Sequence, residues 1–435
     1  MNRRDFNQTF TKYAFGVGAA SIFGVPRLGY SKNETSPIDT LHLPKNLESI
    51  FQTPYPRFSE SEYSLRRKAL AEVMRAQEVD ILLLVTAGGL GNANRWITNW
   101  PGTQQALTIF ELDQTMTMYV EYHNHVPLAK MLAKDVNVIW GGDKGMSPVM
   151  EHLAKISPKK IGVIGPLIGP RWKILESKYQ VVSLDNDYIK LRMIKSEEEI
   201  NWLRIGAAMS DLGMASLIKN TRVGMTEHQL GDLIERTYIG LGGNNWIHYL
   251  GSTSMNNPDV SVPRQFTSRR KIQKGDFVFC ELSASFWDYS GQILRGFTVE
   301  SEPTSLYKDL HQTAYEVFKR ITSIIRPGIN AQELVEQSGL IEQNGFTTND
   351  DLVHGYGGGY FAPILGSKSR PSGYASDLIL KENMCMVVQP NVITKDEKAG
   401  VQFGELIRVT KTGFESLHRT PHGLFKAGQN ISTVK

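Results

Sequence analysis

The chain has 435 residues, of which 41% are hydrophobic and 21% are charged, and its formal net charge is +4. This is the composition of a globular protein that is long enough for two domains with separate cores. So small a charge does not indicate a nucleic-acid-binding surface or a polybasic membrane surface. The two cysteines, Cys280 and Cys385, exclude a disulfide framework.

Residues 1–31 have the layout of an export segment. The pair Arg3-Arg4 is followed by a mildly apolar stretch at 13–25. That stretch is too short for a membrane span, which needs about 20 apolar residues. The layout resembles a bacterial twin-arginine signal and predicts an exported, periplasmic protein. The alternative interpretation is a basic tail.

Residues 32–59 are expected to form a linker, and residues 60–190 to form an α/β domain. One segment with helical apolar spacing is followed by short apolar runs that are typical of buried strands. The helical segment is 61–77, and the runs are 81–85, 106–112, 116–122, 136–140 and 161–165.

Residues 191–425 contain a faint internal repeat, with a tail expected at 426–435. Three helix starts carry a capping residue with Glu or Gln three positions later, which is the pattern of a capping box. These pairs are Ser196 with Glu199, Thr226 with Gln229, and Asn330 with Glu333. The second and third pairs open matching helix–strand segments, so we predict a pseudo-twofold α/β domain with a site between its halves.

Several segments of this second domain resemble the landmarks of the pita-bread family. They include LRMIKSEEEINWLR (191–204), KIQKGDFVFCEL (271–282), HGYGGG (354–359) and LKENMCMVVQP (380–390). The family contains methionine aminopeptidase, Xaa-Pro aminopeptidase, prolidase and creatinase, and the resemblance covers roughly residues 60–420. It implies a creatinase-like N-terminal α/β domain followed by a pita-bread domain. From creatinase it also implies a homodimer.

Peptidases of this family hold two metal ions with the ligand set Asp, Asp, His, Glu, Glu. By resemblance, the matching positions here are Glu281, Gln292, His354, Gln389 and Gly404. Arg295 stands at the family's arginine position. Arg264 replaces the family's catalytic histidine, and Phe361 replaces a further histidine.

These replacements remove the charge that paired cations need. Two divalent ions a few ångströms apart are held by several bridging carboxylates, whereas this set keeps only Glu281. Carboxamide oxygens are neutral, and glycine offers no side chain. We therefore expect no metal cofactor, with a single weakly held divalent ion left open.

The resulting hypothesis is a metal-independent hydrolase or lyase that cleaves a C–N bond in a small polar, carboxylate-bearing substrate. Glu281 and His354 would transfer protons, and Arg264 would bind the substrate carboxylate through paired hydrogen bonds. Further substrate contacts are expected from Gln292, Gln389, His248 and Arg295. The alternatives are a non-catalytic binding protein and a metal-dependent Xaa-Pro aminopeptidase or dipeptidase.

Two structural alternatives stay open at this point. Glu281 could be an ion-pair partner of Arg295 rather than a reacting group. If the last strand slipped by one residue, Glu405 would replace Gly404 in the site, because a one-residue slip reverses the face of a strand.

Overall fold

The computed structural model describes residues 41, 43–51, 53–142, 146–372 and 377–431. The predicted export segment, residues 1–31, lies outside the described residues. Everything described below belongs to one compact unit, residues 37–435.

The first part of the chain forms a six-stranded mixed sheet in the order β4-β3-β2-β1-β5-β6. The strand β1 pairs with β2 in the antiparallel direction and with β5 in the parallel direction. Each of the five apolar runs of the sequence coincides with a strand to within two residues at its ends, and a sixth strand follows them. The strands are β1 (Ile81–Thr86), β2 (Ala106–Glu111), β3 (Met116–Val120), β4 (Asn137–Trp140), β5 (Lys160–Ile164) and β6 (Gln180–Ser183).

Helices connect these strands. The first, α3 (Glu60–Ala76), begins where the Ser59 hydroxyl accepts a hydrogen bond from the backbone N–H of Glu62. The others are α4 (Ala93–Thr98), η2 (His123–His125), α5 (Val126–Leu132), α6 (Met146–Ile156), α7 (Gly169–Glu176) and α8 (Asp185–Met193).

Part of the expected linker is ordered structure. Residues 45–51 form the helix α2 (Lys45–Phe51). Apolar side chains before, within and after it are buried in the main core, namely Leu41, Leu43, Leu47 and Phe58. The expectation of a linker is wrong for the stretch around α2, because burial of these side chains holds it against the second domain.

The second part forms a nine-stranded sheet. Its main path is β11-β10-β12-β15-β9-β8-β7, with β16 beside β15 and β17 beside β9. Its strands are β7 (Asn244–Ser254), β8 (Asp276–Phe286), β9 (Tyr289–Thr298), β10 (Val353–Tyr356), β11 (Tyr360–Leu365), β12 (Cys385–Val388), β15 (Gly404–Val409), β16 (Phe414–Ser416) and β17 (Phe425–Lys426). A separate pair consists of β13 (Val392–Ile393) and β14 (Gly400–Val401). The expected C-terminal tail therefore begins inside β17.

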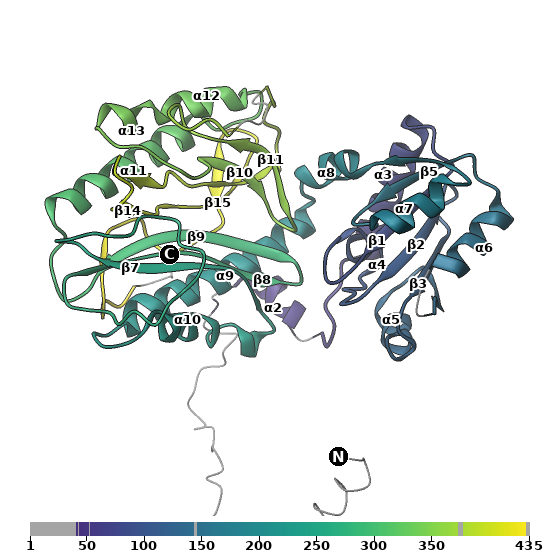
Figure 1. Cartoon of the computed structure of the whole chain (residues 1–435), viewed down its shortest axis with the longest axis horizontal. Helices are drawn as coiled ribbons and strands as arrows, with labels where there is room; N and C mark the ends of the chain where they lie inside the picture. Colours follow the sequence, from purple (N-terminus) through teal and green to yellow (C-terminus); the bar gives the residue numbers. More distant parts are fainter. Residues whose placement is uncertain (1–40, 42, 52, 143–145, 373–376, 432–435) are drawn as a thin grey trace, which may run out of the picture. The chain divides into compact units, whose positions relative to one another are not determined.

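The helices of this part fall into two groups, each along one half of the sheet (Figure 1). The first group packs along β7, β8 and β9. It consists of α9 (Glu197–Asn220), α10 (Glu227–Glu235) and η3 (Ile239–Leu241). The second group consists of α11 (Ser305–Ile324), α12 (Ala331–Glu336), η4 (Gln337–Gly339) and α13 (Leu340–Gln343). The three predicted capping boxes open α9, α10 and α12.

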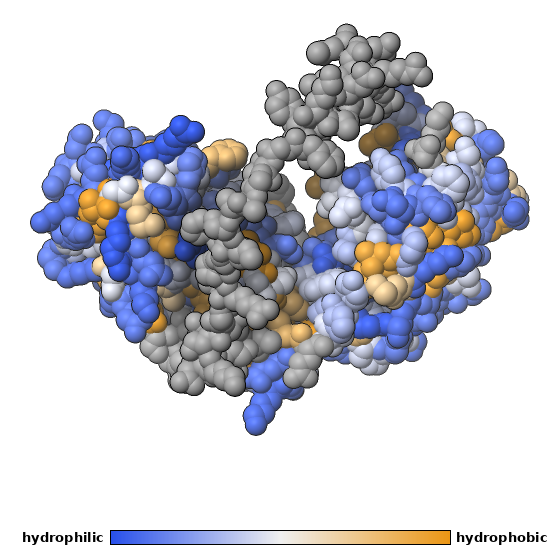
Figure 2. Space-filling view, turned by 90° about the horizontal axis from the view of Figure 1, so that it is seen from below, coloured by the Kyte–Doolittle hydropathy of each residue, from blue (hydrophilic) through white to orange (hydrophobic). Residues whose placement is uncertain are grey.

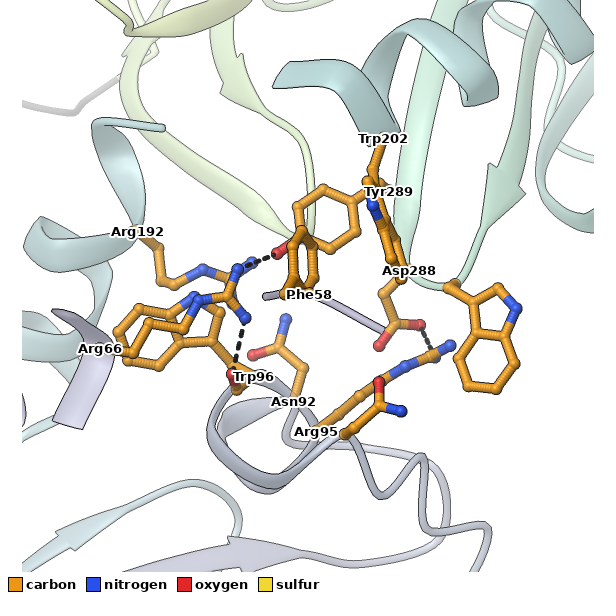
Figure 3. A pocket seen from close by; sticks show the side chains of 11 residues that line it. Phe58, Arg66, Asn92, Arg95, Trp96, Arg192, Trp202, Asp288 and Tyr289 are labelled. Carbon is orange, nitrogen blue, oxygen red and sulfur yellow. Dashed lines mark hydrogen bonds and ion pairs between the residues drawn. The ribbon is translucent and has the colours of Figure 1, made fainter. Parts of the chain in front are cut away.

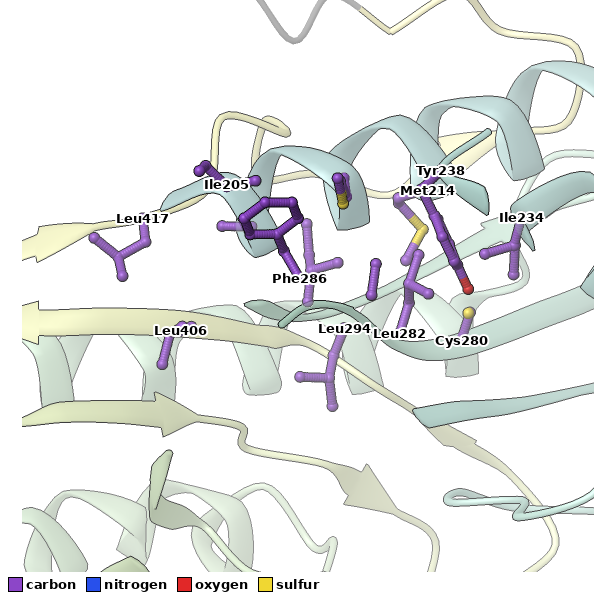
Figure 4. Packing of buried hydrophobic residues seen from close by; sticks show 14 of the residues in the cluster. Ile205, Met214, Ile234, Tyr238, Cys280, Leu282, Phe286, Leu294, Leu406 and Leu417 are labelled. Atoms are coloured by element: carbon purple, nitrogen blue, oxygen red, sulfur yellow. The ribbon is translucent and has the colours of Figure 1, made fainter. Parts of the chain in front are cut away.

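The helix α9 fixes the position of the strands that carry the site. Its apolar side chains pack on one face of β8 and β9, where Cys280 and Leu282 are buried (Figure 4). The backbones approach closely, since a Cβ added at Gly291 would lie 2.2 Å from the Cα of Ala207. Alternate residues of β8, including Glu281, consequently point away from the helix.

A buried charged cluster joins α3, α8 and α9. The Glu199 carboxylate accepts a hydrogen bond from Tyr289 and lies within ion-pair distance of Arg66 and Arg192. Burial alone would raise the pKa of Glu199, but these arginines lower it to about 2. The adjoining cavity, shown in Figure 3, has a volume of about 20 Å³, which is room for about one water molecule and not for a substrate.

Where the surface in Figure 2 is coloured, hydrophilic residues are interrupted by groups of hydrophobic residues. Within the described ranges, no helix combines the length and the apolar composition that crossing a membrane requires.

Candidate active site

Strand register places Glu281 and Gln292 side by side. In the β8–β9 pair, Ser283 is opposite Gln292, and Glu281 lies two residues from Ser283 on the same face. The Gln292 Nε2 donates a hydrogen bond to Oε1 of Glu281 at 2.8 Å. Both side chains are buried, with 4% and 0% exposure.

The second half of the sheet adds Gln389 and His354. His354 lies on β10 opposite Val387 of β12, and Gln389 follows the end of β12. The Oε1 of Gln389 accepts a hydrogen bond from Gln292 Nε2 at 2.9 Å and lies 3.3 Å from Nε2 of His354. Four of the five predicted positions thus form one hydrogen-bonded chain, in which two carboxamides separate Glu281 from His354.

Gln402 is a site residue that sequence reasoning missed. It is fully buried, and its Nε2 donates to Oε2 of Glu281 at 2.8 Å. Glu281 is therefore held by a carboxamide on each oxygen. Gln402 lies two residues before Gly404, but it stands at none of the family's ligand positions, so the resemblance gave no reason to select it.

Asp350 is a second carboxylate that the sequence reasoning missed. Its Oδ2 accepts hydrogen bonds from Asn391 Nδ2 at 2.7 Å and from Gln389 Nε2 at 3.5 Å. The adjacent pair Asp350-Asp351, four residues before His354, was the available signal in the sequence.

Burial governs the protonation states in this cluster. It raises the pKa of Glu281 well above the usual range, with a further contribution from the charge of Asp350. It also raises the pKa of Asp350 to about 6, and it lowers the pKa of His354 to about 4. These shifts favour the protonated form of Glu281, keep His354 neutral at neutral pH, and leave most of Asp350 ionised there.

The low pKa of His354 makes stability depend on pH within a defined window. An unfolded histidine titrates near pH 6.5, so between about pH 6.5 and the folded pKa of about 4 the unfolded chain binds a proton that the folded chain does not. The free energy of unfolding consequently falls as the pH drops through this window. Between about pH 7 and about pH 5, the free energy of unfolding of His354→Gln should therefore fall by about 2 kcal/mol less than that of the parent. Urea unfolding at both values, with exposed His228→Gln as control, measures this; equal losses in parent and His354→Gln would contradict it.

The register of β15 excludes a side chain at the fifth ligand position. Gly404 is opposite Leu294 and Glu405 is opposite Ile293, which confirms the register that places Gly404 at the site. A Cβ added at Gly404 would lie 2.2 Å from the carbonyl oxygen of Val388. No glutamate fits here without a movement of the backbone.

We therefore expect Gly404→Ala to destabilise the protein by about 1–3 kcal/mol, the usual cost of overpacking. The matched control is Gly413→Ala, because a Cβ at Gly413 meets no atom within 4 Å. Urea denaturation compares the two variants, and equal stability would show that the strands move apart freely.

Arg295 does not contact the Glu281 cluster, so its predicted substrate role is corrected. Its guanidinium is fully buried and forms an ion pair with Glu405 at 2.5 Å. It also donates to the carbonyl oxygens of Gly404, Thr420 and Pro421. With its donors used inside the protein, Arg295 is structural, and it is not the partner of Glu281.

His248 is also corrected, because it lies on the opposite face of the sheet. In the β7–β8 pair Tyr249 is opposite Glu281, whereas His248 is opposite Leu282 on the side of the helices. Its ring nitrogens contact Glu235 and Tyr238 at 3.2 and 2.8 Å. It lines a separate pocket of about 640 Å³ beside α10.

Arg264 lies on the same face of the sheet as Glu281. A Cβ at Gly251 would meet its Cδ at 2.9 Å, and Gly251 is opposite Phe279, two residues before Glu281. Among the described residues, its guanidinium has no hydrogen-bond or ion-pair partner. Arg264 is thus an unpaired cation on the Glu281 face of the sheet.

Aromatic side chains enclose His354. The ring of Tyr360 stacks on the imidazole with centroids 4.2 Å apart, and the ring of Tyr356 meets it edge-on at 5.4 Å. Phe361, which stands where the family has a second histidine, is buried in the apolar core behind the site. It therefore offers no polar atom to a ligand.

The residues at the five family positions do not fit a centre of two metal ions. Gln292 turns its NH₂ group toward Glu281 and Gln389, and Gln402 does the same toward Glu281, so N–H groups occupy the space beside the carboxylate. Among the described residues, no group of three or more His, Cys, Asp or Glu side chains is arranged to hold a metal ion. The carboxamide oxygens of Gln292, Gln402 and Asn391 are buried without a partner in the part of the chain that the structure describes.

Comparisons with known proteins identify what this arrangement is similar to. Residues 201–411 match the model of metallopeptidase family M24. The chain is 25% identical over 241 residues to the Xaa-Pro dipeptidase of Pyrococcus furiosus, covering 55% of this chain and 67% of the relative. It is 20% identical over 416 residues to the creatinase of Bacillus sp. (strain B-0618), covering 89% and 97%.

Solved structures give the same fold. The prolidase from Pyrococcus horikoshii OT3 superposes with a TM-score of 0.72 at 22% identity, covering 83% of this chain and 99% of that one. The X-Pro aminopeptidase from Thermotoga maritima MSB8 gives 0.71 at 19% identity, with 83% and 99% covered. The prediction of a two-domain pita-bread architecture is confirmed.

The expectation that the protein needs no metal cofactor is corrected by these comparisons. It rested on the residue types at five positions, whereas the matching family is one of metallopeptidases. A metal is therefore what the family implies. The donor groups described above nevertheless differ from a two-ion set, so the chemistry below is derived from side chains alone.

Proposed function

Because this chain belongs, through residues 201–411, to the pita-bread proteins of metallopeptidase family M24, we propose that it hydrolyses a C–N bond in a small polar substrate. The observation that carries the proposal is the hydrogen-bonded chain from Glu281 through Gln292 and Gln389 to His354. It holds a buried acid and a buried imidazole at two ends of one fixed frame, which is the arrangement that general acid–base catalysis requires.

The protonation states suggest the roles. Burial raises the pKa of Glu281 well above its usual range and so favours the protonated form, which can protonate the departing nitrogen. Neutral His354, fixed between Tyr360 and Gln389, is the base that would accept a proton from the attacking water.

The unpaired Arg264 supports a substrate with a carboxylate. A guanidinium binds a carboxylate with two parallel hydrogen bonds. The position of Arg264 on the Glu281 face of the sheet would set the distance between the bound carboxylate and the scissile bond. Dipeptides and other acylated amino acids have this combination of groups.

The second candidate is a metal-dependent Xaa-Pro dipeptidase, and the comparisons favour it. A relative from Pyrococcus furiosus carries that name, and the matching family is one of metallopeptidases. The cleaved bond would again join carbon to nitrogen in a small substrate with a carboxylate.

One assay separates the two candidates. The protein is incubated with Gly-Pro, glycinamide and creatine, and the released amine is measured after chelation and after addition of Mn²⁺, Co²⁺ or Zn²⁺. Turnover that survives chelation supports side-chain chemistry at Glu281. Gly-Pro cleavage that depends on added metal supports the dipeptidase. Lack of turnover in every condition would contradict both and favour a binding protein.

Location and assembly stay predictions from the sequence. We propose export through residues 1–31 from their twin-arginine layout, and a homodimer from the creatinase resemblance. Cell fractionation and light scattering of the purified protein test these two proposals separately.

A further inference from the structure

Next to the Glu281 cluster lie two carboxylates without a cationic partner. Asp350 and Asp351 precede β10, and among the described residues neither lies within ion-pair distance of a Lys, Arg or His. Asp350 accepts hydrogen bonds from Asn391 and from the backbone N–H of Asp351 at 2.7 and 2.9 Å. Asp351 accepts one from the hydroxyl of Tyr360. These bonds orient the carboxylates but leave their charge uncompensated.

A buried acceptor beside Asp350 also lacks a partner. Asn391 is fully buried, and its Nδ2 is used by Asp350, while its Oδ1 has no hydrogen-bond partner among the described residues. Leaving a buried carbonyl oxygen without a hydrogen bond destabilises the protein. A ligand that donates N–H groups at this position would recover that free energy.

Aromatic rings border the same place. The ring of Tyr360 is 48% exposed while it stacks on His354. Tyr249, opposite Glu281 on β7, lies close enough for the charges of Glu281 and Asp350 to add to the effect of burial in raising its pKa. Carboxylates, a free carbonyl oxygen and aromatic rings together are the groups that bind an organic ammonium ion.

We propose that Asp350 and Asn391, bordered by Asp351 and Tyr360, form a subsite for the protonated primary amine of the substrate. None of these residues stands at one of the five family ligand positions. The need to satisfy Asn391 Oδ1 favours an ammonium with N–H donors over a quaternary ammonium, which has none. The inference rests on the proposed function, and with Arg264 as the carboxylate contact it defines a zwitterionic substrate.

The test measures binding rather than turnover. Isothermal titration compares Gly-Pro and glycinamide with their N-acetylated forms, which keep the shape of the chain but lack the ammonium. The protein carries Glu281→Gln, so that hydrolysis does not consume the probes. Asp350→Asn is introduced into this background, with exposed Asp396→Asn as the matched control. Asparagine fits at 350 because the free Oδ1 of Asn391 can accept from the new amide once the Asn391 side chain turns over.

The free amines are expected to bind at least about tenfold more tightly than the acetylated forms, the smallest value for a charge-assisted hydrogen bond. Asp350→Asn should remove this preference, whereas Asp396→Asn should keep it. Equal binding of free and acetylated probes, an unchanged preference in Asp350→Asn, or no amine binding at millimolar concentration would overturn the subsite. If the amine preference is found but the parent protein cleaves no substrate, the proposed hydrolase is contradicted and the subsite stands.

Discussion

Glu281→Gln is expected to lower turnover of the best substrate at least about 100-fold, because positioned proton transfer contributes roughly 10²–10⁴ to the rate. The fold should tolerate the change. The new amide meets Nε2 groups of Gln292 and Gln402, but the Oε1 of Gln402 has no partner and can accept from it after the Gln402 side chain turns over. The loss should therefore appear in kcat with little change in the melting temperature.

The control for this variant is Glu302→Gln, an acidic residue outside the site. It pairs with Lys426, and its side chain is 75% exposed. Steady-state kinetics and thermal melts on parent, variant and control are compared at one pH. Full turnover by Glu281→Gln would remove Glu281 from proton transfer, while a large drop in melting temperature would mean that the lost activity reports on folding.

Arg295→Met is expected to lower the free energy of unfolding by about 3–5 kcal/mol, the cost of leaving a buried charge without its partner. The ion pair with Glu405 is almost completely buried, with side-chain exposures of 0% and 2%. Burial alone would raise the pKa of Glu405, but the charge of Arg295, aided by His422, holds it well below its usual range. Without Arg295 this carboxylate must either remain charged in an apolar core or take up a proton.

A double variant separates charge from packing. Glu405→Gln added to Arg295→Met removes the stranded carboxylate and should recover part of the lost stability in urea denaturation. The stability that the parent gains from the carboxylate of Glu405 depends on pH. The stability that a lowered carboxylate pKa contributes is present above the unfolded value near 4.3 and is lost as the pH falls below it. An Arg295→Met protein that is fully stable but binds substrate weakly would restore the substrate role that the geometry argues against.

The local rules of the chain predicted much of the fold. The capping boxes at Ser196, Thr226 and Asn330 depend on residues three positions apart, and all three begin helices. The apolar runs of the first domain became strands for a similarly local reason. The stretch around α2 escaped prediction, because its apolar side chains gain their stability from a distant surface of the second domain.

The sequence by itself determined which residue types occupy the family positions, and hence that Glu281 and His354 would belong to one site. Only the tertiary structure decided which neighbours they have. The alternation of side chains along β7 places His248 on the far face of the sheet. Arg295 pairs with Glu405 and not with the site. Asp350 and Gln402, from segments far away in the chain, contact Gln389 and Glu281. The physical reason is that a side chain's type is a local property, whereas its burial, its partners and its pKa depend on the register of strands brought together from distant parts of the chain.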